Sequence, residues 1–155
     1  MCCRSLPGCV TRALSASRTR RLGWRNRALL VEALGSLALA RVAVRALPFR
    51  FIARRLGEHM AESSREFAGG ETPGLVAWAV SAAARRTPWR SKCLEQAIAT
   101  KLMLRRRAVP STIYFGVARP AEAHAWVRVG SRTVIGGGET DRYAVVASFA
   151  DLDTP

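Results

Sequence analysis

The sequence predicts an α+β domain in which helices come first and a mostly antiparallel sheet follows. Two segments, 75–86 and 93–107, repeat apolar residues at steps of three and four, the period of a helix. After Pro110 the period changes to two, and β-branched and aromatic residues dominate, as is typical of strands. Runs of helices followed by runs of strands indicate the α+β class. With 155 residues, we expect one such domain.

Composition and charge favour a folded chain with acidic partners. Hydrophobic residues make up 49% and charged residues 23%, which is typical of a chain that folds. The net charge is +14, and only Lys92 and Lys101 of the 25 basic residues are lysines. Arginine binds carboxylates and phosphates through its fork of donors, so nucleic acid, an acidic peptide or protein, and an anionic membrane surface are all candidates. A GC-rich genome would enrich arginine without any binding role.

The first 27 residues predict a disordered basic arm. They carry arginines throughout and lack an apolar run, so they are not a signal peptide. A start codon assigned too early would explain the same segment. Cys2, Cys3 and Cys9 lie in this arm and Cys93 stands alone, a distribution that predicts no disulfide framework and favours a reducing, cytoplasmic setting.

Residues 28–57 predict a helix pair that packs or docks. Glu32, Arg41 and Arg45 interrupt the apolar run, so a membrane-spanning helix is not expected. Pro48 ends the first helix near Leu47, and a second runs over 49–56 and stops at Gly57. The charges do not form one stripe, which favours packing on a partner or on the domain body and leaves peripheral membrane contact as an alternative.

The main folded domain is expected over residues 58–155. A polar loop over 58–74 precedes the helix at 75–86. The next helix starts at Cys93 and ends in Arg105, Arg106 and Arg107, which complement the negative end of its dipole. Strands are expected at 111–119, 124–130, 131–137 and 143–149, with a hairpin turn at Gly130-Ser131.

Cys93 is the candidate nucleophile. It lies where a helix begins, directly after a turn containing Pro88 and Trp89, and amides and dipole at a helix start favour a thiolate. Arg90 and Lys92 would act in the same direction. The alternative is a buried structural cysteine, the commoner role of a lone cysteine.

His124 is the candidate base. It opens the strand HAWVRV between Ala123 and Ala125, which leave the imidazole room, whereas His59 has no supporting pattern. A cysteine at a helix start with a histidine at a later strand is the layout of papain-like and transglutaminase-like thiol enzymes. A metal site is the rival use of these residues, but Zn²⁺ needs about three or four ligands, and too few are present.

Two blocks carry a specific resemblance. The run PWRSKCLEQ contains Pro88, Trp89, Cys93 and Leu94, and the run AHAWVRVG contains His124, Ala125, Trp126 and Val127. Over residues 29–150 the chain resembles the peptidase part of the lasso-peptide biosynthesis B protein. The resemblance implies a transglutaminase-like, papain-like fold, with residues 58–155 as the catalytic domain. It also implies a cysteine peptidase that cleaves the leader from a ribosomally made precursor.

The resemblance also implies partners. An asparagine-synthetase-like cyclase would close the ring, and any ATP would be used there. This chain is expected to bind no cofactor, because the glycines at 136–138 lack the Lys and helix of a phosphate-binding loop. The residues before Leu29 are too few for a leader-binding domain, so we expect a separate leader-recognition protein to present the leader. Only the net charge suggests a nucleic-acid partner, and none is expected. The expected localisation is cytoplasmic, with membrane association through the biosynthetic complex as the alternative.

The third catalytic residue departs from the family pattern. An aspartate is usual about twelve positions after the histidine, and Gly136 stands there. Glu139, Asp141 or a backbone carbonyl would then orient the imidazole. The Cys93 amide is the expected oxyanion donor, with the Trp89 indole N–H as an additional candidate. Trp126 shares a strand face with His124 and would shield it.

Two other functions stay open at this point. The same fold would serve as an inactive scaffold that binds precursor and cyclase, had its chemistry been lost with the aspartate. Acyl transfer in place of hydrolysis is the second. The matched Cys93 and His124 blocks favour the peptidase over the scaffold.

Overall fold

The α+β prediction is confirmed. The computed structural model describes residues 23–66, 70–138 and 140–151. Its elements are, in order, α1 (Trp24–Ala46), α2 (Phe49–Leu56), β1 (Glu58–His59), α3 (Thr72–Ala84), α4 (Cys93–Arg105), β2 (Thr112–Ala118), β3 (Glu122–Val129), β4 (Arg132–Ile135), η1 (Thr140–Arg142) and β5 (Ala144–Ala150). The strands form one sheet of order β1-β5-β2-β3-β4, and every neighbouring pair is antiparallel.

The helix boundaries follow local sequence signals. Helix α2 spans the expected residues, and Gly57 ends it at φ 114° with no room for a side chain, since a Cβ there would lie 2.2 Å from the Ala150 carbonyl oxygen. Helix α1 begins at Trp24, so residues 24–27, which the sequence assigned to the arm, are helical. Residues 1–22 and the three cysteines among them lie outside the described residues.

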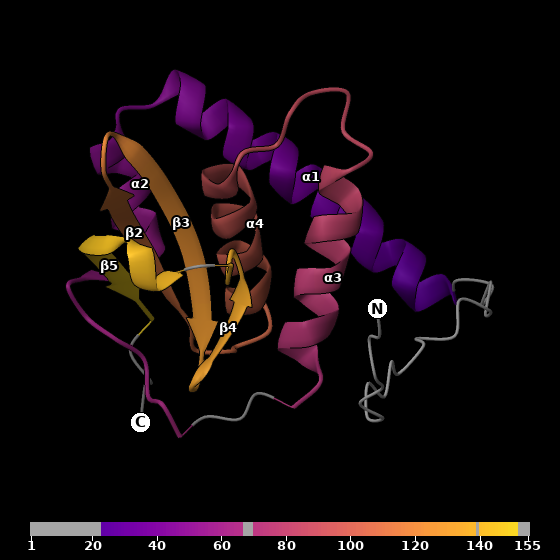
Figure 1. Cartoon of the computed structure of the whole chain (residues 1–155). Coiled ribbons are helices and arrows are strands. Elements are labelled where there is room, and N and C mark those ends of the chain that lie inside the picture. Colours follow the sequence, from indigo (N-terminus) through magenta and orange to yellow (C-terminus); the bar gives the residue numbers. More distant parts are fainter. Residues whose placement is uncertain (1–22, 67–69, 139, 152–155) are drawn as a thin grey trace, which may run out of the picture.

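The helices cover one face of the sheet (Figure 1). Helix α4 is central, because it packs on α1 and α3 on one side and on β3 on the other. Phe115 of β2 and Phe149 of β5 meet Phe49 of α2 on the same face, with ring centroids 5.4 and 6.3 Å from that of Phe49. The core between the layers is built mainly from small and branched side chains, among them Leu37, Val76, Val80, Ala97, Ile98, Leu104, Ile113, Ala125 and Val127.

The other face of the sheet is crossed by the segment that follows β1. Arg128 of β3, only 6% exposed, holds this segment. Its guanidinium donates to the Tyr114 hydroxyl at 2.9 Å, the Ser63 carbonyl at 3.1 Å and Glu62 at 3.3 Å. The Ser63 amide donates to Thr112 Oγ1 at 2.9 Å. Arg128 is thus a charged strand residue that is buried, and it fixes the segment after β1 to the sheet.

The arginines at the end of α4 join that helix to α1. Arg107 donates to both Glu32 carboxylate oxygens, at 3.0 and 2.5 Å, and to the Met103 carbonyl at 2.8 Å. Arg106 lies 3.4 Å from Glu32 as well. The helix-end role expected for these arginines is thus accompanied by an ion pair between helices. Within the described part of the chain, no helix is long and apolar enough to cross a membrane.

Candidate active site

Cys93 is the first residue of α4. Its thiol is free and half-buried. No side chain caps this helix start, so the amides of the first turn have no side-chain acceptor. The first turn also contains Glu95, which is buried and paired with Arg41 of α1 at 3.1 Å. The arrangement combines a thiol with unused backbone donors, the combination that an oxyanion site needs.

The connection that leads into Cys93 is fixed by Thr87. The Thr87 hydroxyl contacts the Ala84 carbonyl at 2.9 Å, the Trp89 carbonyl at 2.8 Å and the Ser91 hydroxyl at 3.0 Å. Gln96, one turn into α4, donates from Nε2 to the Ser91 carbonyl at 2.9 Å. These bonds hold the backbone on both sides of Cys93, and neither Thr87 nor Gln96 was predicted to have this role.

Trp89 packs against α1. The Arg41 guanidinium lies 5.4 Å from its ring centroid, so one arginine contacts both Trp89 and Glu95. The indole Nε1 is buried and has no hydrogen-bond acceptor among the described residues. Trp89 therefore joins the helix start to α1, while the N–H that the sequence proposed as an oxyanion donor is unused.

His124 of β3 is held by a backbone carbonyl. Its Nε2 lies 2.8 Å from the Gly136 oxygen, on the segment after β4. Gly136 adopts φ 73°, and a Cβ there would lie 2.7 Å from the Ala125 carbonyl oxygen and 2.9 Å from the Trp126 Cβ. Only glycine fits this close approach. The position at which the resemblance implies an aspartate side chain thus supplies a main-chain acceptor.

Two aromatic rings pack against the imidazole, and an acid is hydrogen-bonded to one of them. The Tyr143 centroid lies 5.0 Å away and that of Trp126 lies 5.9 Å away, nearly parallel at 22°. Trp126 thus stacks on His124 as its position on the same face predicted. Glu122, which sequence reasoning did not single out, accepts from the Tyr143 hydroxyl at 2.6 Å; this bond, with the nearby Arg142 and His124, lowers the Glu122 pKa.

Of the two acids proposed as orienting groups, only Asp141 lies within the described residues. Asp141 is exposed in η1, and within the described residues it makes no hydrogen bond to the imidazole. Glu139 lies outside the described residues. Of the candidates, the carbonyl of Gly136 is therefore the one seen at hydrogen-bond distance.

Cys93 and His124 lie on neighbouring elements. Helix α4 packs on β3, and both begin at the upper end of the molecule in Figure 1. Ala125 and Val127 point into the core with the helices, so His124 alternates toward the other face of the sheet. Among the described residues no hydrogen bond joins the thiol to the imidazole.

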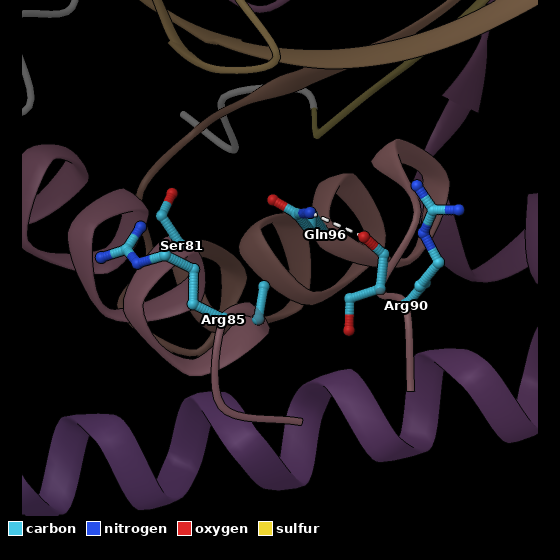
Figure 2. Close-up of a pocket in the computed structure, with 6 residues that line it drawn as sticks. Ser81, Arg85, Arg90 and Gln96 are labelled. Atoms are coloured by element: carbon cyan, nitrogen blue, oxygen red, sulfur yellow. Dashed lines mark hydrogen bonds between the residues drawn. The ribbon is translucent and has the colours of Figure 1, made fainter. Parts of the chain in front are cut away.

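A hollow of about 460 Å³ lies beside the start of α4. Figure 2 shows Ser81 on α3, Arg85 directly after α3, Gln96 on α4 and Arg90 on the connection between the two helices. Arg85 and Arg90 are exposed and flank the hollow from opposite sides. The hollow offers guanidinium and hydroxyl donors within a few residues of Cys93. No group of three or more His, Cys, Asp or Glu side chains in the described ranges is arranged to hold a metal ion.

The fold and the two sequence blocks define a family. The chain belongs to the transglutaminase-like superfamily, whose sequence profile matches residues 36–148. The match includes Cys93, His124 and Gly136. The superfamily is typically cysteine-protease-like in fold. No curated protein and no solved structure matches the chain significantly.

Proposed function

We propose that this chain is a cysteine peptidase that removes the leader from a lasso-peptide precursor, with Cys93 as nucleophile and His124 as base. One observation supports this most strongly. A carbonyl oxygen only accepts hydrogen bonds, so the contact with Gly136 fixes the hydrogen of His124 on Nε2. The Nδ1 lone pair is then available to take the proton of a thiol.

The chemistry would proceed through an acyl-enzyme. His124 Nδ1 takes the Cys93 proton, and the sulfur attacks the carbonyl carbon of the last leader residue. The oxyanion forms near the uncapped first-turn amides of α4. The C–N bond then breaks, and the imidazolium gives its proton to the departing amine of the core peptide. Water, deprotonated by the same imidazole, hydrolyses the thioester and frees the leader.

Substrate and partners are part of the same proposal. The precursor leader would be presented by a separate recognition protein, and an asparagine-synthetase-like cyclase would take the released core peptide. ATP, where used, belongs to the cyclase. The setting is cytoplasmic. The hollow lined by Arg85 and Arg90 supports a polar or acidic peptide segment beside the cleaved bond.

A catalytically inactive scaffold of the same fold is the second candidate. It is favoured by the orientation of His124, which points to the face opposite the helices and makes no hydrogen bond to the thiol within the described residues. A scaffold would bind precursor and cyclase through the same surfaces but would not need a reactive Cys93.

Covalent labelling tests the proposal. The probe is the leader peptide of the precursor, ending in a chloromethyl ketone and supplied with the recognition protein. We expect alkylation of Cys93 in preference to Cys2, Cys3 and Cys9, located by peptide mapping, and loss of labelling in Cys93→Ala. We expect His124→Ala to slow labelling at least tenfold. Equal labelling of all four cysteines, or none, would favour the scaffold.

A further inference from the structure

Helix α1 presents an apolar stripe to solvent along its whole length. The stripe, here called the outer stripe, consists of exposed residues spaced three or four apart, the spacing of one helix face: Trp24, Ala28, Val31, Gly35, Leu39, Val42 and Ala46. Trp24 is 74% exposed, Val31 69% and Val42 61%. None of these residues is polar.

The opposite face of α1 is already used. Ala33, Ser36, Leu37 and Ala40 are buried against α3 and α4. A helix with apolar residues on two opposite faces is normally covered on both. With a rise of about 1.5 Å per residue, the outer stripe is about 33 Å long, much more than the scattered apolar residues of an ordinary surface.

The charges beside the outer stripe are basic. Helix α1 contains four arginines and one acid, Glu32. That acid forms ion pairs with Arg106 and Arg107 of the α4 end. Arg27 and Arg45 lie on the same edge of the stripe, five turns apart, and neither has a carboxylate partner within the described residues. Arg25 lies over the Trp24 ring at 5.5 Å, so an aromatic and a cation stand together at one end.

We propose that the outer stripe lies on an anionic lipid surface, with α1 parallel to the membrane plane. An apolar helix face with a terminal Trp and flanking arginines is the pattern of a helix that sinks into the headgroup layer. The arginines would contact lipid phosphates, and Trp24 would lie at the level of the headgroups. An acidic protein partner would match the arginines equally, but a continuous uncharged stripe fits the hydrocarbon boundary better.

Vesicle co-sedimentation of the full chain tests this. We expect binding to vesicles of phosphatidylglycerol and phosphatidylcholine, and at least tenfold weaker binding to phosphatidylcholine alone. Val31→Asp with Val42→Asp should reduce binding to the anionic vesicles at least tenfold, because each removes an apolar contact and adds a negative charge. Val146→Asp is the matched control, since Val146 is 55% exposed on β5 and should bind as wild type does.

A second variant pair tests the charges separately. Arg27→Gln with Arg45→Gln should weaken binding about fivefold for each arginine, and the loss should shrink in high salt. Circular dichroism checks that every variant is folded. Wild type that stays in the supernatant with anionic vesicles would overturn the proposal and favour a protein partner. Undiminished binding of the double aspartate variant would overturn it too, because residues outside the stripe would then be responsible.

Discussion

The imidazole Nε2 of His124 lies 2.8 Å from the carbonyl oxygen of Gly136. This contact fixes the ring without adding a negative charge. A buried aspartate both orients a catalytic histidine and stabilises the imidazolium, and losing it lowered kcat about 10⁴-fold in one serine enzyme. A carbonyl does the first and only weakly the second. We therefore expect slow leader removal by this chain, in which orientation is retained and charge stabilisation is reduced.

Placing an aspartate at position 136 should not raise the rate of leader removal. Gly136→Asp should lower the free energy of unfolding by about 2 to 4 kcal/mol, because the residue has positive φ and its Cβ would meet the backbone of β3. Urea unfolding measures this, and leader removal should decrease as well. Gly138→Asp is the control, since a Cβ at Gly138 meets nothing within 4 Å. Faster leader removal by Gly136→Asp would contradict this account.

The aromatic ring of Tyr143 should contribute more to the kcat of leader removal than its hydroxyl does. Tyr143→Phe retains the ring against His124 and loses the bond to Glu122, so we expect leader removal within about threefold of wild type. Tyr143→Ala leaves the imidazole unsupported, and a misplaced base should reduce kcat about tenfold or more. The ratio of the two kcat values is the measurement. Equal losses in both variants would assign the effect to the hydroxyl.

Buried Lys101 forms an ion pair with half-buried Asp151, and loss of this pair should destabilise the fold. Lys101 is 1% exposed, and its Nζ lies 2.8 Å from Asp151 and 2.7 Å from the Ser111 carbonyl. Asp151→Asn should reduce the free energy of unfolding by about 2 to 4 kcal/mol at pH 7, because a buried ammonium loses its partner. Adding Lys101→Met should recover part of this. No recovery in the double variant would show that the loss has another cause.

The same pair predicts a pH effect with a defined sign. Burial lowers the Lys101 pKa below 10.5, while Asp151 opposes this. At pH values between the Lys101 pKa in the folded chain and 10.5, Lys101 is protonated more often in the unfolded chain than in the folded one. The contribution of Lys101 to the free energy of unfolding therefore rises with pH. Asp151→Asn lowers the folded pKa further. The stability gap between wild type and Asp151→Asn should therefore narrow from pH 7 to pH 10, and a constant gap would contradict the assignment.

The ion pair between α1 and α4 should contribute at neutral pH and disappear in acid. The hydrogen bond from Arg107 is the main cause that holds the Glu32 pKa below 4.5, against the effect of burial. The stabilisation by this ion pair is fully present above pH 4.5. It is lost as the pH falls through the pKa that Glu32 has in the folded chain. Glu32→Gln should cost about 1 kcal/mol at pH 7, and this cost should shrink as the pH falls below 4.5. Glu58→Gln, exposed and without an ion pair in the described residues, is the control.

Much of the fold follows from local signals. Pro48 and Gly57 bound α2 as expected, and the change of period after Pro110 locates β2 and β3 to within about two residues. Strand β1 was not predicted, because Glu58 and His59 are polar and join the sheet only by pairing with β5. The burial of Arg128 was not predictable either, since its partners Glu62 and Ser63 come from a distant loop.

The candidate site was predictable only where side chains carry the signal. Cys93 at a helix start and His124 on a strand can be read from their neighbours. The carbonyl of Gly136 could be proposed only as one of several groups, because every residue has a carbonyl and its direction depends on φ 73°. Glu122 was missed because its link to the site passes through Tyr143, twenty-one residues later.

Leader removal, followed by mass spectrometry, tests the central claim most directly. Wild type, Cys93→Ala and His124→Ala would each be mixed with the precursor and the recognition protein, with precursor binding measured in parallel. We predict that wild type releases the leader and that Cys93→Ala binds the precursor but releases none, with His124→Ala slower than wild type by at least about a hundredfold. If wild type binds the precursor and releases nothing, or if Cys93→Ala releases the leader at the wild-type rate, Cys93 is not the nucleophile of a leader peptidase.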